Sequence, residues 1–263
     1  MKKRKSFLYN YVDYIWCVHD LAREERLENL DKQFDFLGID VNDSSKFSFM
    51  YSIIYDAIFE KEYQFYIRTY ELARSKGYIM NTGNNLNHNL VSFAYNIYKI
   101  FKISLAKGYK KILVFENDIL SYSDKKVMKK YLDNIPEDAN CVSLSSSYDL
   151  AKKDLVREIG YPEDNQYYID EKKFSMSGIY SCSACIFDGA YMNSFIKLCD
   201  EYSLLVTPDW YYIMRQIFNL NIYYSDMSMF IQMDHVKNKM DIHLNEESDY
   251  SKYINGIDNE TSK

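Results

Sequence analysis

Short apolar runs of strand length alternate with longer amphipathic segments along this chain, and this alternation is the feature that most restricts its fold. Residues 14–18 form the first apolar run, and the following segment places Leu30 and Phe34 four positions apart, as on one face of a helix. Strands that alternate with helices are typical of an α/β domain. With no internal repeat and no linker in 263 residues, we expect one domain over residues 1–245 and a polar tail over 246–263.

The same patterns predict the other elements. Glycine or proline marks several helix ends, as at Gly38, Gly108 and Pro136, and Ser123 or Asp124 can cap a helix start. Residues 151–176 are polar and are expected to form an irregular surface segment. Further strands are predicted at 47–54, 112–115, 141–144, 179–187, 220–224 and 228–233, and helices at 23–37, 56–76, 89–105, 124–135, 191–198 and from Thr207.

Composition and charge exclude several classes of function. The net charge is −6 with acidic and basic residues interspersed, so no broad basic surface is expected for nucleic acid. No run is long enough for a membrane span, and Asn10 and Asp13 interrupt the apolar part of a signal-like N-terminus. The basic residues 2–5 are expected to be a solvated tail, with a marginal contact to an anionic membrane surface as the alternative. We therefore expect a cytoplasmic protein, with peripheral contact to the inner face of the membrane left open.

Five cysteines, an odd number, favour reduced thiols in a cytoplasm. Cys182 and Cys185 form a C-x-x-C pattern, but no second pair has the spacing of a zinc site. Both lie in the strand-like run "GIYSCSACIFD". We interpret them as core thiols.

An acidic motif at the end of a strand is the most specific candidate site. In "KKILVFENDIL", the apolar run 112–115 leads directly into Glu116, Asn117 and Asp118. Ligands of open α/β sheets bind outside the carboxyl ends of the strands, and one or two carboxylates with phosphate oxygens can hold a divalent cation. A solvated acidic turn explains the same residues, and the local sequence does not decide between the two interpretations.

Two arginines follow the first strand, at the expected start of the first helix. Arg23 and Arg26 lie where the helix dipole already presents partial positive charge, which disfavours cations unless an anion binds there. Guanidinium groups bind phosphate through two hydrogen bonds, so a phosphate is one explanation. The neighbouring acids Asp20, Glu24 and Glu25 supply the other, as ordinary surface ion pairs.

Taken in order, these motifs resemble a known family. The segment "DLAREER" is similar to an N-L-x-R-x-x-R pattern after the first strand, "NLNHNLVSFAYNIYKIF" to a helix preceded by S-H, "ILVFENDI" to a strand ending in E-D-D, and "TPDWYY" to a P-x-D or P-D-W segment. Over roughly residues 12–235 the chain resembles glycosyltransferase family 25, the lipooligosaccharide-type galactosyltransferases related to collagen galactosyltransferases. Asp20, Asn87 and Asn117 depart from the family pattern, and Asn117 removes one possible ligand of a metal or ribose.

The resemblance implies a GT-A fold, a Rossmann-like mixed α/β sheet flanked by helices that binds a nucleotide-diphospho-sugar. It implies Mn²⁺ or Mg²⁺ as cofactor, a UDP-sugar as donor, with galactose the family's commonest pairing, and a glycan or glycolipid acceptor such as a surface polysaccharide or lipooligosaccharide. By resemblance, Asp118 is a direct metal ligand, Glu116 and Asn117 lie at the ribose or the metal, and Arg23 and Arg26 lie at the nucleotide. A non-catalytic module that binds nucleotide or glycan is the alternative, because Asn117 replaces an acid.

An inverting transfer also needs a general base for the acceptor hydroxyl. Asp209 matches the acid of the family's P-x-D region, although an acid in the first turn of a helix is stabilised without catalysis, and Asp188 is the second candidate. His88 is a candidate for orienting the substrate or for a helix cap. His235 is a candidate for completing the metal site, with a solvated surface position as the alternative. The stereochemical outcome and the oligomeric state are not determined by these residues.

Overall fold

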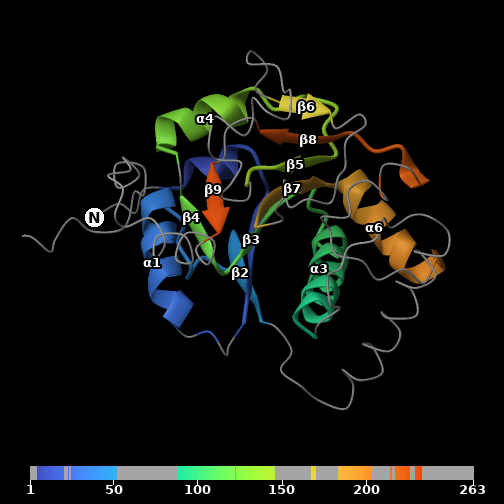
Figure 1. The fold of residues 1–263 in the computed structure, drawn as a ribbon, viewed down its shortest axis with the longest axis horizontal. Helices are drawn as coiled ribbons and strands as arrows, with labels where there is room; N and C mark the ends of the chain where they lie inside the picture. The colour runs from blue at the N-terminus through green and yellow to red at the C-terminus, as the bar shows by residue number, and fades with distance from the viewer. Residues whose placement is uncertain are drawn as a thin grey trace, which may run out of the picture.

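A seven-stranded mixed sheet lies between two layers of helices in the structure, which is a computed structural model (Figure 1). The predicted fold class, a mixed α/β sheet flanked by helices, is confirmed. The structure describes residues 5–20, 23, 25–51, 88–121, 123–145, 167–169, 183–202, 214, 217–225 and 229–232. The predicted helix at 56–76, the helix start at Thr207 and the predicted tail lie outside these residues.

The predicted elements that fall on described residues are present, with ends shifted by a few residues. The predicted caps are also present, because Asp124 accepts hydrogen bonds from two backbone N–H groups of α4, and Gly38 and Gly108 have φ of 72° and 75°. The helices are the 3₁₀ helix η1 (Phe7–Asn10), α1 (Glu25–Leu37), α3 (His88–Ala106), α4 (Lys125–Asp133) and α6 (Gly189–Tyr202). The strands are β1 (Tyr14–His19), β2 (Phe47–Tyr51), β3 (Lys111–Glu116), β4 (Ile119–Ser121), β5 (Cys141–Ser143), β6 (Tyr167–Ile169), β7 (Ala184–Asp188), β8 (Ile222–Ser225) and β9 (Phe230–Gln232).

The strand order places β1 between β2 and β3. The full order is β2-β1-β3-β7-β5-β8-β6, and β1 runs parallel to both of its neighbours. The chain passes from β1 to β2 on one side and later returns to the other side with β3, so the winding of the sheet reverses at β1. Such a reversal in a parallel sheet opens a crevice at the carboxyl ends of the strands, where ligands bind. In contrast, β7 runs antiparallel to both β3 and β5.

Two apolar cores, one on each face of the sheet, hold the helices in place. Alternate residues of a strand point to opposite faces. On β1, Tyr14, Trp16 and Val18 belong to the core with α3 and α6, whereas Ile15 and Cys17 belong to the core with α1 and α4.

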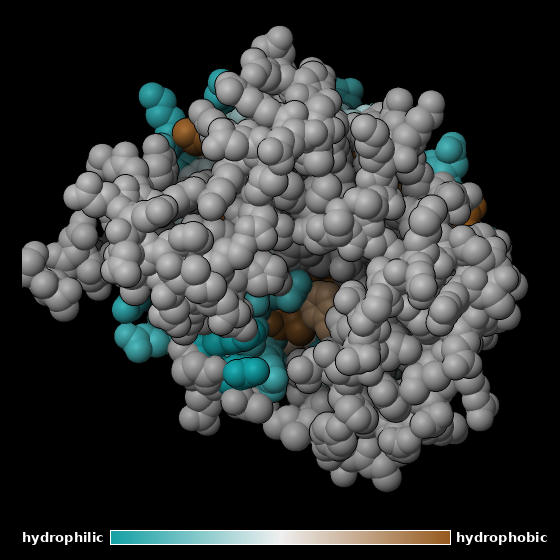
Figure 2. All heavy atoms as spheres, viewed as in Figure 1, coloured by the Kyte–Doolittle hydropathy of each residue, from teal (hydrophilic) through white to brown (hydrophobic). Residues whose placement is uncertain are grey.

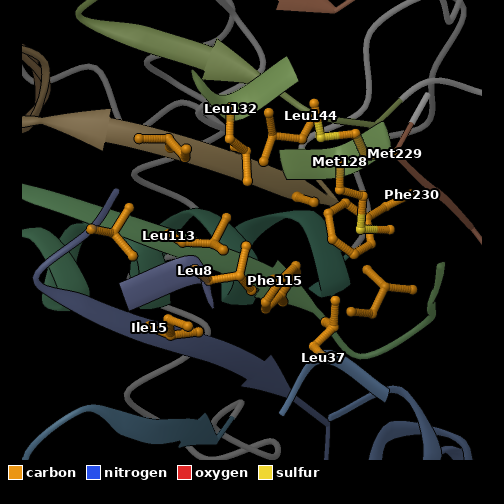
Figure 3. Close-up of a cluster of buried hydrophobic side chains, with 14 of the residues drawn as sticks. Leu8, Ile15, Leu37, Leu113, Phe115, Met128, Leu132, Leu144, Met229 and Phe230 are labelled. Carbon is orange, nitrogen blue, oxygen red and sulfur yellow. The ribbon is translucent and has the colours of Figure 1, made fainter. Parts of the chain in front are cut away.

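Figure 3 shows the second of these cores. Leu113 and Phe115 of β3 lie there with Met128 of α4 and Phe230 of β9, which come from distant parts of the sequence. The Phe115 and Phe230 rings meet edge to face with centroids 5.1 Å apart. This packing fixes the direction in which β3 ends, and therefore the place of the acidic motif.

Two features of the fold differ from the sequence-based expectations. The segment 151–176, predicted to be irregular, contains β6, which pairs with β8 at the edge of the sheet. The short strand β4, which was not predicted, pairs with β9 in a separate two-stranded sheet. Both strands have three residues, and each pairs with a strand that is distant in the sequence.

Two further expectations concern the cysteine thiols and membrane-spanning helices. Cys185 is fully buried in β7, as predicted for a core thiol, and Cys182 lies outside the description. Within the described part of the chain, no helix combines the length and apolar character that crossing a bilayer requires.

Candidate functional site

The candidate site lies where β1 and β3 end side by side. β1 ends at His19 and β3 at Glu116, and the chain then turns through Asn117 and Asp118 into β4. These ends lie at the point where the winding of the sheet reverses, so the acidic motif occupies the position at which open α/β sheets bind ligands. Figure 2 shows that the face seen in Figure 1 is hollowed near its centre, with hydrophilic and hydrophobic residues together at the hollow.

Asn117 and Asp118 are buried polar residues, with exposed fractions of 6% and 7%. Arg26 of α1 reaches both of them. Its Nη1 donates a hydrogen bond to Asn117 Oδ1 at 2.5 Å and lies 3.9 Å from Asp118 Oδ2. The arginine and the acidic motif, 91 positions apart in sequence, therefore form one site.

A line of polar side chains on α1 explains why Arg26 lies there. Arg26, Asn29 and Gln33 share one face of the helix and bond at positions 117, 119 and 121 in turn. Asn29 Nδ2 donates to Ile119 O at 3.0 Å, and Gln33 Oε1 accepts from Ser121 N at 2.7 Å. The three side chains on α1 follow one another at about one helical turn, and their partners at positions 117, 119 and 121 follow one another at two residues. Because these two spacings match, the contacts fix Arg26 beside the acidic motif.

Arg23 lies differently from Arg26. It precedes α1, which begins at Glu25, and it is exposed. Its backbone N–H donates to Asp20 O, and its own carbonyl accepts from Arg26 N. The structure therefore places Arg26 in the first turn of the helix, as predicted, and Arg23 in the turn before it.

The negative charge at the end of β3 affects the neighbouring thiol of Cys17. Burial raises the pKa of the Cys17 thiol well above its ordinary value, and the charges of Asp118 and then Glu116 raise it further. Both carboxylates are thus close enough to the same buried sulfur to act on it. The end of β3 is a concentration of negative charge that Arg26 offsets in part.

Two residues of the site were missed by the sequence analysis. His19 is fully buried at the end of β1, and its Nδ1 lies 3.3 Å from Asn117 Nδ2. Beside it at the end of β2, Tyr51 is 48% exposed, and its ring centroid lies 6.1 Å from that of His19. His19 follows the apolar run 14–18 as directly as Glu116 follows its own run, and this signal could have found it.

Asp188, predicted as a second general base, lies level with the start of β3, whereas the acidic motif lies at its end. Because β7 is antiparallel to β3, its last residue pairs with Lys111, the first residue of β3. Asp188 Oδ1 accepts a hydrogen bond from Tyr191 N at 2.8 Å, which makes Asp188 the N-cap of α6. Asp188 therefore lies at the opposite end of β3 from the acidic motif, and its role as a general base stays a prediction.

Three other predicted site residues cannot be located by their side chains. His88 is the first residue of α3, but only its backbone is described. Asp209 and His235 lie outside the described residues. Their predicted roles stay predictions.

The carboxylates present fit a hard divalent cation. Within the described ranges there is no group of three or more His, Cys, Asp or Glu side chains that could hold a metal ion. Glu116 and Asp118 nevertheless supply two carboxylates, which is the usual protein share of a Mg²⁺ site completed by phosphate oxygens and water. In chemical type, these two carboxylates are therefore compatible with such a cation.

Comparisons with known proteins were made by sequence and by structure. No family model and no curated protein matches the chain. Solved structures with a similar chain path include mouse xyloside xylosyltransferase 1 in its apo form, at 9% identity and a TM-score of 0.35, covering 80% of this chain and 83% of that one. The glycosyltransferase GlyE of Streptococcus pneumoniae TIGR4 has 9% identity and a TM-score of 0.41 over 92% of this chain and 62% of that one. A glycosyltransferase involved in glycosylation of the major capsid of PBCV-1 has 6% identity and a TM-score of 0.38 over 88% and 99%. At these scores the likenesses carry no weight for function, which has to be argued from the residues.

Proposed function

We propose that this chain is a metal-dependent glycosyltransferase of the GT-A type, which moves a sugar from a UDP-sugar to a glycan or glycolipid acceptor. The observation that supports it is the meeting of Arg26 with Asn117 and Asp118 at the carboxyl ends of β1 and β3. This arrangement is suited to a diphosphate. The Arg26 guanidinium can bind its oxygens directly, and the two carboxylates can bind it through a divalent ion. The resemblance of the ordered motifs to glycosyltransferase family 25 favours galactose as the sugar, and a surface polysaccharide or lipooligosaccharide as the acceptor.

The proposal gives a role to several residues of the site and to three predicted residues whose side chains the structure does not describe. Asp118, with Glu116, would hold Mn²⁺ or Mg²⁺, which when bound supplies positive charge to the departing diphosphate. Arg26 adds a guanidinium charge beside the same group, and α1 holds it in place before the substrate arrives. The exposed ring of Tyr51, at the end of β2, is suited to stacking on the nucleobase. Asp209 is the proposed general base, and His88 and His235 are proposed contacts of substrate and metal.

Thermal melting tests the binding part of the proposal. We expect UDP and Mn²⁺ together to raise the melting temperature, because both bind the native state. At a UDP concentration of about 100 times the dissociation constant, the gain is about 2.7 kcal/mol. For a domain of this size that corresponds to a rise of roughly 5–11 °C.

A matched pair of aspartate variants makes the test specific. Asp118→Asn keeps the shape of the side chain and removes a charge at the site, whereas Asp188→Asn makes the same change at the opposite edge of the sheet. We expect Asp118→Asn to lose the metal-dependent rise and the release of UDP from UDP-sugars, and Asp188→Asn to keep both. If the two variants behaved alike, the acidic motif would not be part of the proposed site.

One observation favours the second candidate, a non-catalytic module that binds nucleotide or glycan. Asn117 stands where the resembling family carries an acid, and Arg26 already uses its amide oxygen. A screen of nucleotide sugars for UDP release separates the two functions. A melting shift without turnover of any donor, hydrolysis included, would favour the module.

A further inference from the structure

His19 is joined to Arg26 through the side chain of Asn117. Arg26 Nη1 bonds to Asn117 Oδ1, and Asn117 Nδ2 lies 3.3 Å from His19 Nδ1. His19 and Asn117 are buried; His19 is the last residue of β1, and Asn117 directly follows β3, the adjacent parallel strand, so the three side chains form a chain of contacts across the site. The direction of each hydrogen bond in this chain follows from chemistry.

A guanidinium group donates hydrogen bonds and cannot accept them. The Asn117 atom that faces Arg26 is therefore the amide oxygen, and the amide presents its NH₂ group to His19. An NH₂ group donates, so His19 Nδ1 has to accept. An imidazole that accepts at Nδ1 is neutral and carries its proton on Nε2.

We infer that His19 is a positioning residue, which as the neutral Nε2–H tautomer holds the Asn117 amide and, through it, the Arg26 guanidinium beside Asp118. The asparagine is matched to this arrangement, because an aspartate at position 117 could accept from Arg26 but could not donate to His19. Asn117 then serves to orient the arginine rather than to bind a metal. The consequence for nucleotide binding rests on the proposed function, whereas the positioning itself does not.

Nitrogen NMR of the free protein tests the tautomer. The chain has 4 histidines, and comparison with His19→Phe assigns the His19 signals. We expect His19 with its proton on Nε2 in the wild type, and with a proton on Nδ1 in Asn117→Asp, because the carboxylate demands a donor. A wild-type Nδ1–H or imidazolium, or an unchanged pattern in Asn117→Asp, would overturn the inference.

The positioning of Arg26 is tested by rotation of its guanidinium group. We expect separate, slowly exchanging Nη signals in the wild type, averaged signals in His19→Phe, and recovery in His19→Asn, whose Oδ1 can take the place of Nδ1. A guanidinium that stays ordered in His19→Phe would contradict the role of His19.

Nucleotide affinity then connects the positioning to the proposed function. We expect UDP to bind about 3- to 10-fold more weakly to His19→Phe, since one lost hydrogen bond lowers the fraction of correctly placed Arg26 by about that factor. His19→Asn should recover most of the loss. Failure of the wild type to bind UDP would refute the proposed function, while the two NMR measurements would still decide the inference. Equal UDP affinity of His19→Phe and wild type would overturn the positioning role.

Discussion

Gln33 is the buried end of the polar line on α1, and its replacement by methionine tests how that helix is held. The side chain is fully buried, and its Oε1 accepts from Ser121 N at 2.7 Å. Methionine has nearly the same length and shape but no strong acceptor, so Gln33→Met removes the partner of the Ser121 N–H without opening a cavity.

The magnitude follows from the loss of that partner. A buried N–H that loses its acceptor costs about 1–3 kcal/mol, and the gain in apolar burial from methionine offsets part of it. We expect Gln33→Met to lower the free energy of unfolding by about 1–2 kcal/mol. For a domain of this size the melting temperature should fall by roughly 2–8 °C.

Urea unfolding of the variant, followed by circular dichroism, gives the free energy directly. Lys32→Met is the matched control, because Lys32 is the exposed neighbour on the same helix, and its pair with Glu28 is a surface ion pair. The control should stay within about 0.5 kcal/mol of the wild type. A Gln33→Met variant as stable as the control would show that the Gln33–Ser121 bond does not hold α1 against β4.

Three further predictions concern other parts of the structure. Asp124→Ala should cost about 1 kcal/mol in urea unfolding and Asp124→Ser clearly less, because Asp124 accepts from Lys126 N and Val127 N at the start of α4. Burial first, and then two nearby aspartates, raise the pKa of Tyr9 from 10.0 to about 12, so its contribution to stability is present below pH 10 and is lost as the pH rises towards 12. Tyr9→Phe should therefore flatten the fall in stability over this pH range, and an unchanged pH profile would contradict the assignment. Tyr51→Ala should change stability by less than about 0.5 kcal/mol but weaken UDP binding by about tenfold in calorimetry if the ring stacks on the base.

Local features of the chain predicted much of the fold. The helix ending at Leu37 could be predicted because its apolar spacing and Gly38 act over a few neighbouring residues. The run 112–115 and the acids after it predicted a strand whose end carries charge, and β3 has this form. Information of this kind survives without tertiary contacts, since propensity, capping and amphipathic spacing are properties of short segments.

The composition of the site depended on how distant segments pack. Asp188 follows an apolar strand just as Glu116 does. However, β7 runs antiparallel to β3, so Asp188 lies beside the start of β3 and not beside its end. Nothing near Asp188 in the sequence encodes that direction, which depends on the neighbouring strands with which β7 pairs.

By itself, the sequence determined where most of the described strands and helices form, with β4 and β6 as exceptions, and that one strand ends in acids. Only the tertiary structure decided which side chains surround those acids: α1 brings Arg26 and the parallel pairing of β1 with β3 brings His19. The physical reason is that a hydrogen bond between side chains needs both partners within about 3 Å, and residues about 90 positions apart reach that distance only when the helix and the sheet have packed.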